Sequence, residues 1–252
     1  MKAIFFISIM VAALALPAFS APARASEMDS RIESSARQSY VFETFLKDDD
    51  IKIESRDGAV TLTGFVSEEY HKSLAQETVA GLPGVKSVDN RLEEVNGAPP
   101  AANSDAWLRD KVETTLLFHR SVSAGTTKVD VKDGIVTLRG DAASQAQKEL
   151  TTEYARDIEG VKEVNNEMTV TKSPGKTRTV GEKIDDASIT AQVKMTLLFH
   201  RSTSALNTKV ETKDGVVTLY GKAGNAAASD LAAKLANDIN GVKGVNNRMV
   251  IE

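Results

Sequence analysis

The stretch that decides the fold is DGAVTLTG at residues 57–64, which returns as DGIVTLRG at 133–140 and as DGVVTLYG at 214–221. In each copy an Asp-Gly pair stands between two segments in which apolar and polar residues alternate. This pattern is typical of two antiparallel strands joined by a two-residue type I′ turn. The sequence therefore predicts three similar β-hairpins.

The second copy shows the expected register. If residues 128–132 pair with 135–139 across the turn, Val131 lies opposite Val136. Side chains alternate between the two faces of a strand, so such apolar pairs belong to one face. We expect this face to be buried.

The repetition extends far beyond the hairpins. Offsets of 76 and 81 residues carry Gly58 onto Gly134 and then onto Gly215, and they align whole units without gaps. The letters LLFHRS at 116–121 even return unchanged at 197–202. We therefore divide the chain into three units, which are residues 28–95, 105–170 and 185–252. The connecting segments 96–104 and 171–184 contain Pro and Gly, and the latter is basic.

Each unit begins with a predicted helix. In the second unit we expect Asp105 to cap it, and its apolar side is predicted to consist of Leu108, Val112, Thr115 and Leu116.

A second helix is predicted over residues 143–158, followed by a strand over 161–170. Its inward side chains are expected to be Ala146, Leu150, Tyr154 and Ile158, and Gly160 is expected to end it. The predicted fold class is α+β, with three tandem αββαβ units, each a three-stranded mixed sheet covered by two helices that closes a small core of its own.

The first 25 residues have the features of a secretory signal peptide. Lys2 precedes an apolar run over residues 4–16, and small residues allow cleavage after Ser20 or after Ala25. An uncleaved membrane anchor is the alternative. After cleavage we expect a soluble protein in the bacterial periplasm, a compartment in which a chain without Cys is safe from oxidation.

Composition excludes several classes of site. With no Cys among its 252 residues, the chain has no disulfide, thiolate metal site or thiol nucleophile. The net charge of −4 argues against nucleic acid as a partner. Charge is uneven, because residues 28–95 sum to −6 whereas residues 171–184 sum to +3.

The hairpin motif, followed by a helix and the pattern G-V-x-x-V-x-N-x-apolar, resembles the BON (bacterial OsmY and nodulation) domain. Three such units behind a signal peptide resemble the OsmY-like members of this family. The residues that carry the resemblance are Gly58, Gly64, Gly84, Asn90, Gly134, Gly140, Gly160, Asn166, Gly215, Gly221, Gly241 and Asn247. The resemblance implies a protein that is not an enzyme, acts in osmotic and envelope stress, and contacts phospholipid surfaces.

We find no catalytic constellation, metal site or cofactor site in the sequence. His119 and His200 are equivalent, but the first unit has Glu43 there, and no second His accompanies either of them. A helix-end imidazole that meets carbonyl groups is the simpler interpretation. The three motif Asn residues are expected to satisfy backbone groups, with a ligand-binding role as the alternative.

One surface stands out on the first helix. Leu117 lies away from the apolar side, as do its equivalents Val41 and Leu198. Cations stand near these positions and in the basic linker: Arg120, Lys194, Arg201, Lys172, Lys176, Arg178 and Lys183. Contact of the third unit and the linker before it with an anionic phospholipid surface is one explanation. Packing of this surface against a neighbouring unit, or an early end of the helix, is the other.

We therefore expect a periplasmic, non-enzymatic stress protein that binds anionic phospholipid surfaces weakly. An array of modules that binds envelope proteins or unfolded polypeptides, as a chaperone does, is the alternative.

Overall fold

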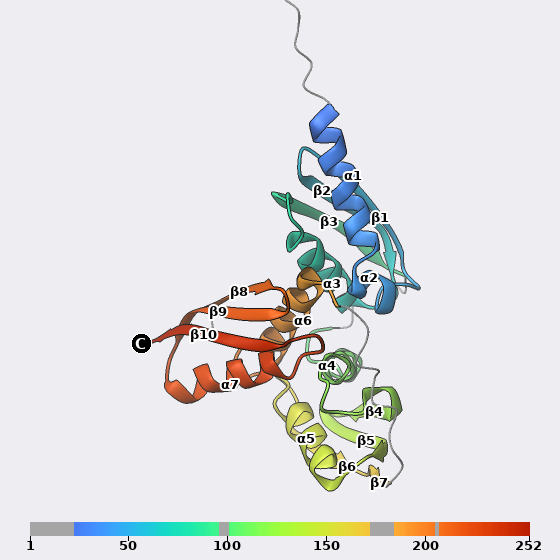
Figure 1. Ribbon diagram of the computed structural model, residues 1–252. Helices are drawn as coiled ribbons and strands as arrows, with labels where there is room; N and C mark the ends of the chain where they lie inside the picture. Colours follow the sequence, from blue (N-terminus) through green and yellow to red (C-terminus); the bar gives the residue numbers. More distant parts are fainter. Residues whose placement is uncertain (1–22, 96–100, 172–183, 205–206) are drawn as a thin grey trace, which may run out of the picture.

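The computed structural model describes residues 23–95, 101–171, 184–204 and 207–252, and it contains three units in chain order (Figure 1). The predicted signal peptide therefore lies outside the described residues, except for the first residues of α1, as do most of the two linkers. The first unit contains α1 (Ala23–Arg37), α2 (Tyr40–Thr44), β1 (Asp50–Arg56), β2 (Ala59–Val66), α3 (Glu69–Ala80) and β3 (Ser87–Glu94). The second contains α4 (Asp105–Phe118), a 3-10 turn η1 (Ala124–Thr126), β4 (Thr127–Lys132), β5 (Ile135–Ala142), α5 (Gln145–Arg156), β6 (Glu163–Asn166) and β7 (Thr169–Val170). The third contains α6 (Asp186–Phe199), β8 (Asn207–Lys213), β9 (Val216–Ala223), α7 (Ala226–Asn237) and β10 (Gly244–Ile251).

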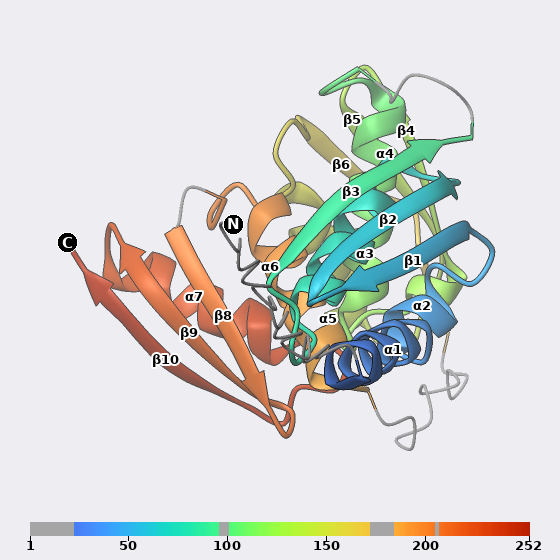
Figure 2. The same ribbon diagram turned by 90° about the horizontal axis from the view of Figure 1, so that it is seen from above.

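Each unit has its own mixed sheet, which confirms the predicted fold class. The middle strand (β2, β5 or β9) pairs antiparallel with the strand before it and parallel with the strand after the second helix. The predicted register holds, because Val131 pairs with Val136 and Val129 pairs with Leu138. In Figure 2, β1, β2 and β3 lie side by side in the sheet of the first unit, and β8, β9 and β10 do so in the sheet of the third unit.

The Asp-Gly turns have the predicted type I′ geometry. Asp133 and Gly134 have φ angles of 54° and 80°, and both central residues of this turn require positive φ. Gly140 serves a different purpose, because a Cβ there would lie 1.9 Å from the carbonyl oxygen of Thr126, which directly precedes the neighbouring strand β4. Only glycine allows this close approach of two backbones.

The N-terminal cap predicted for α4 is wrong by one residue. Ser104 is the cap, and its hydroxyl accepts a hydrogen bond from the N–H of Trp107. Asp105 instead accepts hydrogen bonds from the N–H groups of Asp133 (2.8 Å) and Gly134 (2.9 Å). Its carboxylate therefore ties the start of the helix to the hairpin turn. The predicted apolar side of α4 is buried as expected.

The second helix is shorter than predicted. It ends at Arg156, with Asp157 as its C-cap, four residues before Gly160. Ala146 is exposed, and Thr151 and Ala155 are the buried residues of this helix. The predicted strand over 161–170 is interrupted between β6 and β7, whereas β3 and β10 each run for 8 residues without a break.

The first unit also differs from the others at its start. Where α4 and α6 are continuous, α1 stops at Arg37 and α2 begins at Tyr40. Ser39 caps α2, since its hydroxyl accepts a hydrogen bond from the N–H of Phe42. At the start of α2, the backbone N–H groups of Tyr40 and Val41 donate hydrogen bonds to Asp185 and Ser188 of the third unit.

The three units meet around α6, which lies at the centre of the assembly (Figure 1). This helix packs against α3 of the first unit, α4 of the second, and β8 and α7 of its own unit. Its residues are therefore buried on nearly all sides. The buried apolar side chains of the three units form one continuous cluster, so the expectation of three separate cores is wrong.

Candidate functional site

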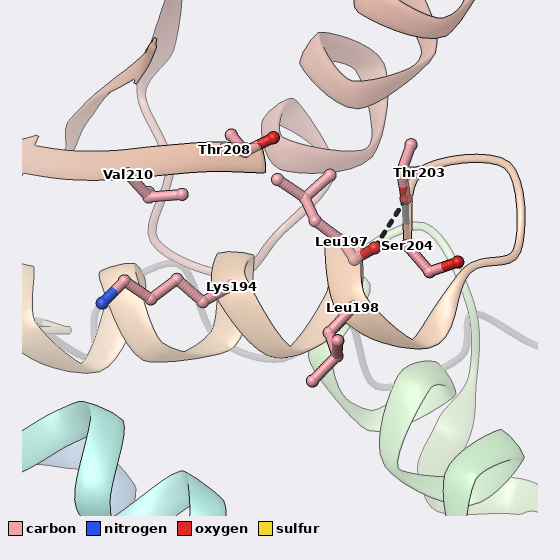
Figure 3. Close-up of a pocket in the computed structure, with 7 residues that line it drawn as sticks. All are labelled: Lys194, Leu197, Leu198, Thr203, Ser204, Thr208 and Val210. Carbon is pink, nitrogen blue, oxygen red and sulfur yellow. Dashed lines mark hydrogen bonds between the residues drawn. The ribbon is translucent and has the colours of Figure 1, made fainter. Parts of the chain in front are cut away.

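The structure separates the leucines of the predicted surface. The side chain of Leu198 is 56% exposed, but Leu117 is partly buried and packs against the core, and Val41 is fully buried. In Figure 3, Leu198 points away from β8, whereas Leu197 points toward it. These three equivalent positions therefore do not form one exposed apolar surface.

The two arginines of that surface bind carbonyl groups of a neighbouring unit. The backbone N–H of Arg120 donates to Asp238 O at 2.9 Å, and its guanidinium donates to the carbonyls of Val242 and Asn237. A helix end carries unpaired carbonyl groups and partial negative charge, which favour a cation. Packing between units, the second interpretation from the sequence, therefore accounts for Arg120.

Arg201 makes the equivalent contacts in the opposite direction. Its N–H donates to Asp157 O at 2.7 Å, and its guanidinium donates to the carbonyls of Val161 and Arg156. Lys194 is also engaged, because its Nζ donates to Glu77 Oε2 at 2.7 Å and so joins α6 to α3. The remaining predicted cations, Lys172, Lys176, Arg178 and Lys183, lie outside the described residues.

The second and third units thus hold each other through one reciprocal set of contacts, which we call the clasp. In the clasp, residues 119–121 of the second unit bind Asp238 of the third unit. Residues 200–202 of the third unit bind Asp157 of the second unit. His119 Nδ1 lies 3.1 Å from Asp238 Oδ2, and His200 Nδ1 lies 3.0 Å from Asp157 Oδ2. Ser121 and Ser202 each donate a hydrogen bond to the other carboxylate oxygen of the same Asp.

The clasp has approximate two-fold symmetry. The offset of 81 residues that carries His119 onto His200 also carries Asp157 onto Asp238. The backbone repeats the relationship, because His119 bridges Ile239 and His200 bridges Ile158. Each of these two units therefore contributes both halves of the contact, as in an isologous interface.

The two imidazoles are deeply buried. Their side chains are 0% exposed, and their ring centroids lie 5.9 Å apart. Tyr154 stacks on His119 at 3.9 Å and donates a hydrogen bond of 2.7 Å to Asp238 Oδ2. Within the part of the chain that the structure describes, the Nε2 atoms of both histidines have no hydrogen-bond partner.

Burial lowers the pKa of His119, and this effect outweighs the hydrogen bond to Asp238, which acts in the opposite direction. Burial would raise the pKa of Asp238, but hydrogen bonds from His119, Ser121 and Tyr154 hold it below its ordinary value. The site therefore consists of a neutral imidazole beside a charged carboxylate.

The first unit lacks every part of the clasp. It has Glu43 in place of the histidine, and Gly81 where the other units have Asp157 and Asp238. Its contacts with the third unit are different, since Tyr40 N–H donates to Asp185 Oδ2 at 2.8 Å. The sequence held a signal for the clasp that we missed: the HRS letters and the helix-end Asp occur together in two units and are both missing from the first.

Two shallow cavities flank Leu198. One, of about 190 Å³, is lined by Lys194, Leu197, Leu198, Thr203, Ser204, Thr208 and Val210 (Figure 3). The other, of about 120 Å³, lies between α3 and α6. Their volumes are below those typical of small-molecule sites, which run from about 300 Å³.

A second surface was not predicted from the sequence. It is the outer face of the third sheet, where strand side chains point away from the helices. We call it the basic sheet face. Its charged residues are Lys209, Lys213, Lys222, Arg248, Glu211 and Glu252, and Lys222 Nζ donates a hydrogen bond to Glu252. Tyr220 lies among them, with Lys209 Nζ 6.0 Å from its ring centroid, and the exposed Val216 and Val250 extend the face.

The equivalent faces of the other units are not basic. At the same positions the first unit carries three cations and three anions: Lys52, Arg56, Arg91, Glu54, Asp89 and Glu93. The second carries three cations and four anions: Lys128, Lys132, Arg139, Asp130, Asp141, Glu163 and Glu167. Lys209 and Lys213 of β8 could have indicated a basic face from the sequence. Only the pairing of β10 with β9 shows that Arg248 lies on the same face.

The motif residues that carried the family resemblance lie in turns, at points where two backbone segments come close together, and at a sheet edge. Asn90 Nδ2 donates to Lys72 O at 2.8 Å, and its Oδ1 accepts from the N–H of Leu92. Asn166 and Asn247 make equivalent bonds. The motif glycines all have positive φ: Gly58, Gly64, Gly84, Gly134, Gly140, Gly160, Gly215, Gly221 and Gly241.

Among the described residues, no three His, Asp or Glu side chains come together in a way that could hold a metal ion. None of the helices in those same ranges has the length and apolar character needed to cross a bilayer.

The sequence profile of the BON domain matches this chain three times, at residues 28–96, 104–172 and 185–252. The chain is 31% identical over 199 residues to the osmotically-inducible protein Y of Escherichia coli, covering 78% of this chain and 95% of that protein. It is 31% identical over 142 residues to the outer membrane lipoprotein DolP of Haemophilus influenzae, covering 56% of this chain and 71% of the relative.

The chain is also similar to parts of solved structures. The C-terminal domain of CdsD, a structural protein of the type III secretion system of Chlamydia trachomatis, aligns over 90% of this chain and 98% of its own. The sequence identity is 17% and the TM-score is 0.24.

Proposed function

Because this chain belongs to the BON domain family, we propose that it is a non-enzymatic envelope protein of the osmotic and envelope stress response. Its relatives include a protein named for osmotic induction and an outer membrane lipoprotein, which support this role. The N-terminal residues support export, and the periplasm is the proposed location. The mature chain recovered from a periplasmic fraction should begin at Ala21 or Ser26 by intact mass.

We further propose that the chain binds anionic phospholipid surfaces weakly, through the basic sheet face. The observation that carries this proposal is the charge at equivalent positions: four cations against two anions in the third unit, and no excess of cations in the other two. Each basic residue near an anionic membrane contributes about 1 kcal/mol, so a few of them support reversible association. A flat face with Tyr220 and exposed valines suits a bilayer surface better than a pocket ligand.

Vesicle flotation tests this proposal. The full chain is mixed with vesicles of phosphatidylglycerol and phosphatidylcholine, or of phosphatidylcholine alone, at low and high salt. We expect flotation only with the anionic vesicles and at low salt. The double variant Lys213→Glu and Arg248→Glu should lose it.

The first unit offers a matched control. Arg56→Glu and Arg91→Glu change the equivalent positions by the same charge, and this variant should float like the natural chain. Equal loss in both variants would show that only net charge matters and would overturn the assignment to the basic sheet face. Suppression of polypeptide aggregation without flotation would favour the chaperone-like alternative.

A further inference from the structure

We propose that the clasp is an acid-sensitive joint, which holds the third unit on the second at neutral pH and releases it when the buried imidazole of His119 takes up a proton. The proposal does not depend on lipid binding. It rests on how two buried imidazoles are placed at one interface between units.

The neutral rings fit the interface. With a hydrogen on Nδ1, each imidazole donates to the carboxylate of the other unit, at 3.1 Å for Asp238 and 3.0 Å for Asp157. The unprotonated Nε2 atoms then face a buried environment that supplies them with no partner among the described residues. A neutral aromatic nitrogen tolerates this better than a charged N–H does.

Protonation changes this balance. The His119 ring would gain an Nε2–H without an acceptor and a positive charge, 5.9 Å from the ring centroid of His200 in the same buried site. The charged and titratable groups around the rings are Asp238, Asp157, Tyr154, Arg120 and Arg201. Each carboxylate is already shared with an arginine and a serine, so it compensates an imidazolium only in part.

The direction in which docking depends on pH follows from the pKa of His119. Its pKa lies below the ordinary value of 6.5 because of burial. The released, solvated ring therefore binds a proton more readily than the docked ring does. Docking is at full strength above pH 6.5 and weakens as the pH falls below that value.

Release would expose aromatic surface that is now covered. Phe118 and Phe199 stand beside the two histidines and are buried. Lys111 Nζ lies 3.6 Å from the ring centroid of Trp107 in the second unit and 5.0 Å from that of Phe199 in the third. Because Trp107 is the single tryptophan of the chain, its fluorescence reports on this interface.

The experiment uses the full chain. Since the chain has no Cys, Glu149→Cys and Asp230→Cys place spin labels at equivalent exposed positions of α5 and α7. We expect one narrow distance distribution at pH 8, and a broad, longer one with altered Trp107 emission at pH 5. The double variant His119→Asn and His200→Asn keeps a donor toward each Asp and removes the titration, so its distances should stay narrow at both pH values.

His71 provides the matched control, because it lies within the first unit beside Asp49, away from the clasp. His71→Asn should leave the transition in place. If the double variant is already undocked at pH 8, the single variant His119→Asn decides, and it should show a less steep transition than the natural chain. Distances that do not change between pH 8 and pH 5, or that change equally in the double variant, would overturn the proposal.

Discussion

The hydroxyl of Tyr154 in α5 donates a 2.7 Å hydrogen bond to Asp238 Oδ2, at the end of α7 in the next unit. This bond breaks the symmetry of the clasp, because the residue equivalent to Tyr154 in the third unit is Leu235. The same tyrosine ring stacks on His119. One side chain of the second unit therefore contacts both members of a His–Asp pair.

We predict that Tyr154→Phe lowers the free energy of unfolding by about 1 to 2 kcal/mol, since it removes a hydrogen bond to a charged group but keeps the stacked ring. Urea denaturation followed by circular dichroism measures this. Tyr220→Phe, on the exposed basic sheet face, should change stability by less than about 0.5 kcal/mol. Equal effects of the two substitutions would contradict the role assigned to Tyr154.

Gly140→Ala should be strongly destabilising. Gly140 has a φ of 121°, and a Cβ would lie 1.9 Å from Thr126 O. We expect a loss of about 3 kcal/mol in the free energy of unfolding, from backbone strain and the displaced strand. Gly125 has no neighbour within 4 Å of an added Cβ, so Gly125→Ala is the control and should be nearly neutral.

Asp105→Ala should loosen the hairpin of the second unit. The carboxylate accepts hydrogen bonds from the N–H groups of Gly134 and Asp133, and these bonds lower the pKa of Asp105. Amide hydrogen exchange at Gly134 should become faster in the variant, while exchange at the equivalent Gly215 stays unchanged. In the natural chain this stabilisation is complete above the ordinary pKa of 3.8 and is lost as the pH falls through the lowered value.

Glu68 should make the contact between the first two units sensitive to alkaline pH. Burial, together with the nearby Asp110, raises the pKa of Glu68 to about 7. A raised carboxyl pKa means that its contribution to stability is complete below 4.5 and is lost as the pH rises through about 7. Glu68→Gln should therefore stabilise the chain at pH 8 by about 1 kcal/mol, because water screens a half-exposed carboxylate.

Thermal unfolding at pH 5 and pH 8 checks the Glu68 prediction. The variant and the natural chain should unfold at nearly the same temperature at pH 5 and should differ at pH 8. Glu69→Gln is the control, since Glu69 is paired with Lys72 at 3.2 Å. A difference at pH 5 that equals the difference at pH 8 would contradict the raised pKa of Glu68.

The hairpins and sheets could be predicted from the sequence because their determinants are local. The positive φ angles of Asp133 and Gly134 and the pairing of Val129 with Leu138 follow from the turn residues and from strict alternation. The repeat then extends one correct unit to the other two. Ser104 and Asp105 are both good helix caps, so local rules could not show that Asp105 binds a turn 28 residues further along the chain.

The contacts between units could not be predicted in the same way. Arg120 and Arg201 follow an off-core leucine and so have the pattern of an exposed basic surface, but they bind carbonyl groups at the ends of helices in another unit. Helical periodicity shows which side chains leave the core of their own unit, and it does not show what covers them. Only the arrangement of the units makes α6 a buried central helix.

Hydrogen–deuterium exchange of the full chain with anionic vesicles tests whether the basic sheet face contacts the membrane. We predict slower exchange in β8, β9 and β10 when phosphatidylglycerol vesicles are present, and no change in β1, β2 and β3, whose outer face has no net charge. Protection should disappear with phosphatidylcholine vesicles. Equal protection of the first and third sheets, or protection confined to the helices, would contradict the basic sheet face as the membrane contact.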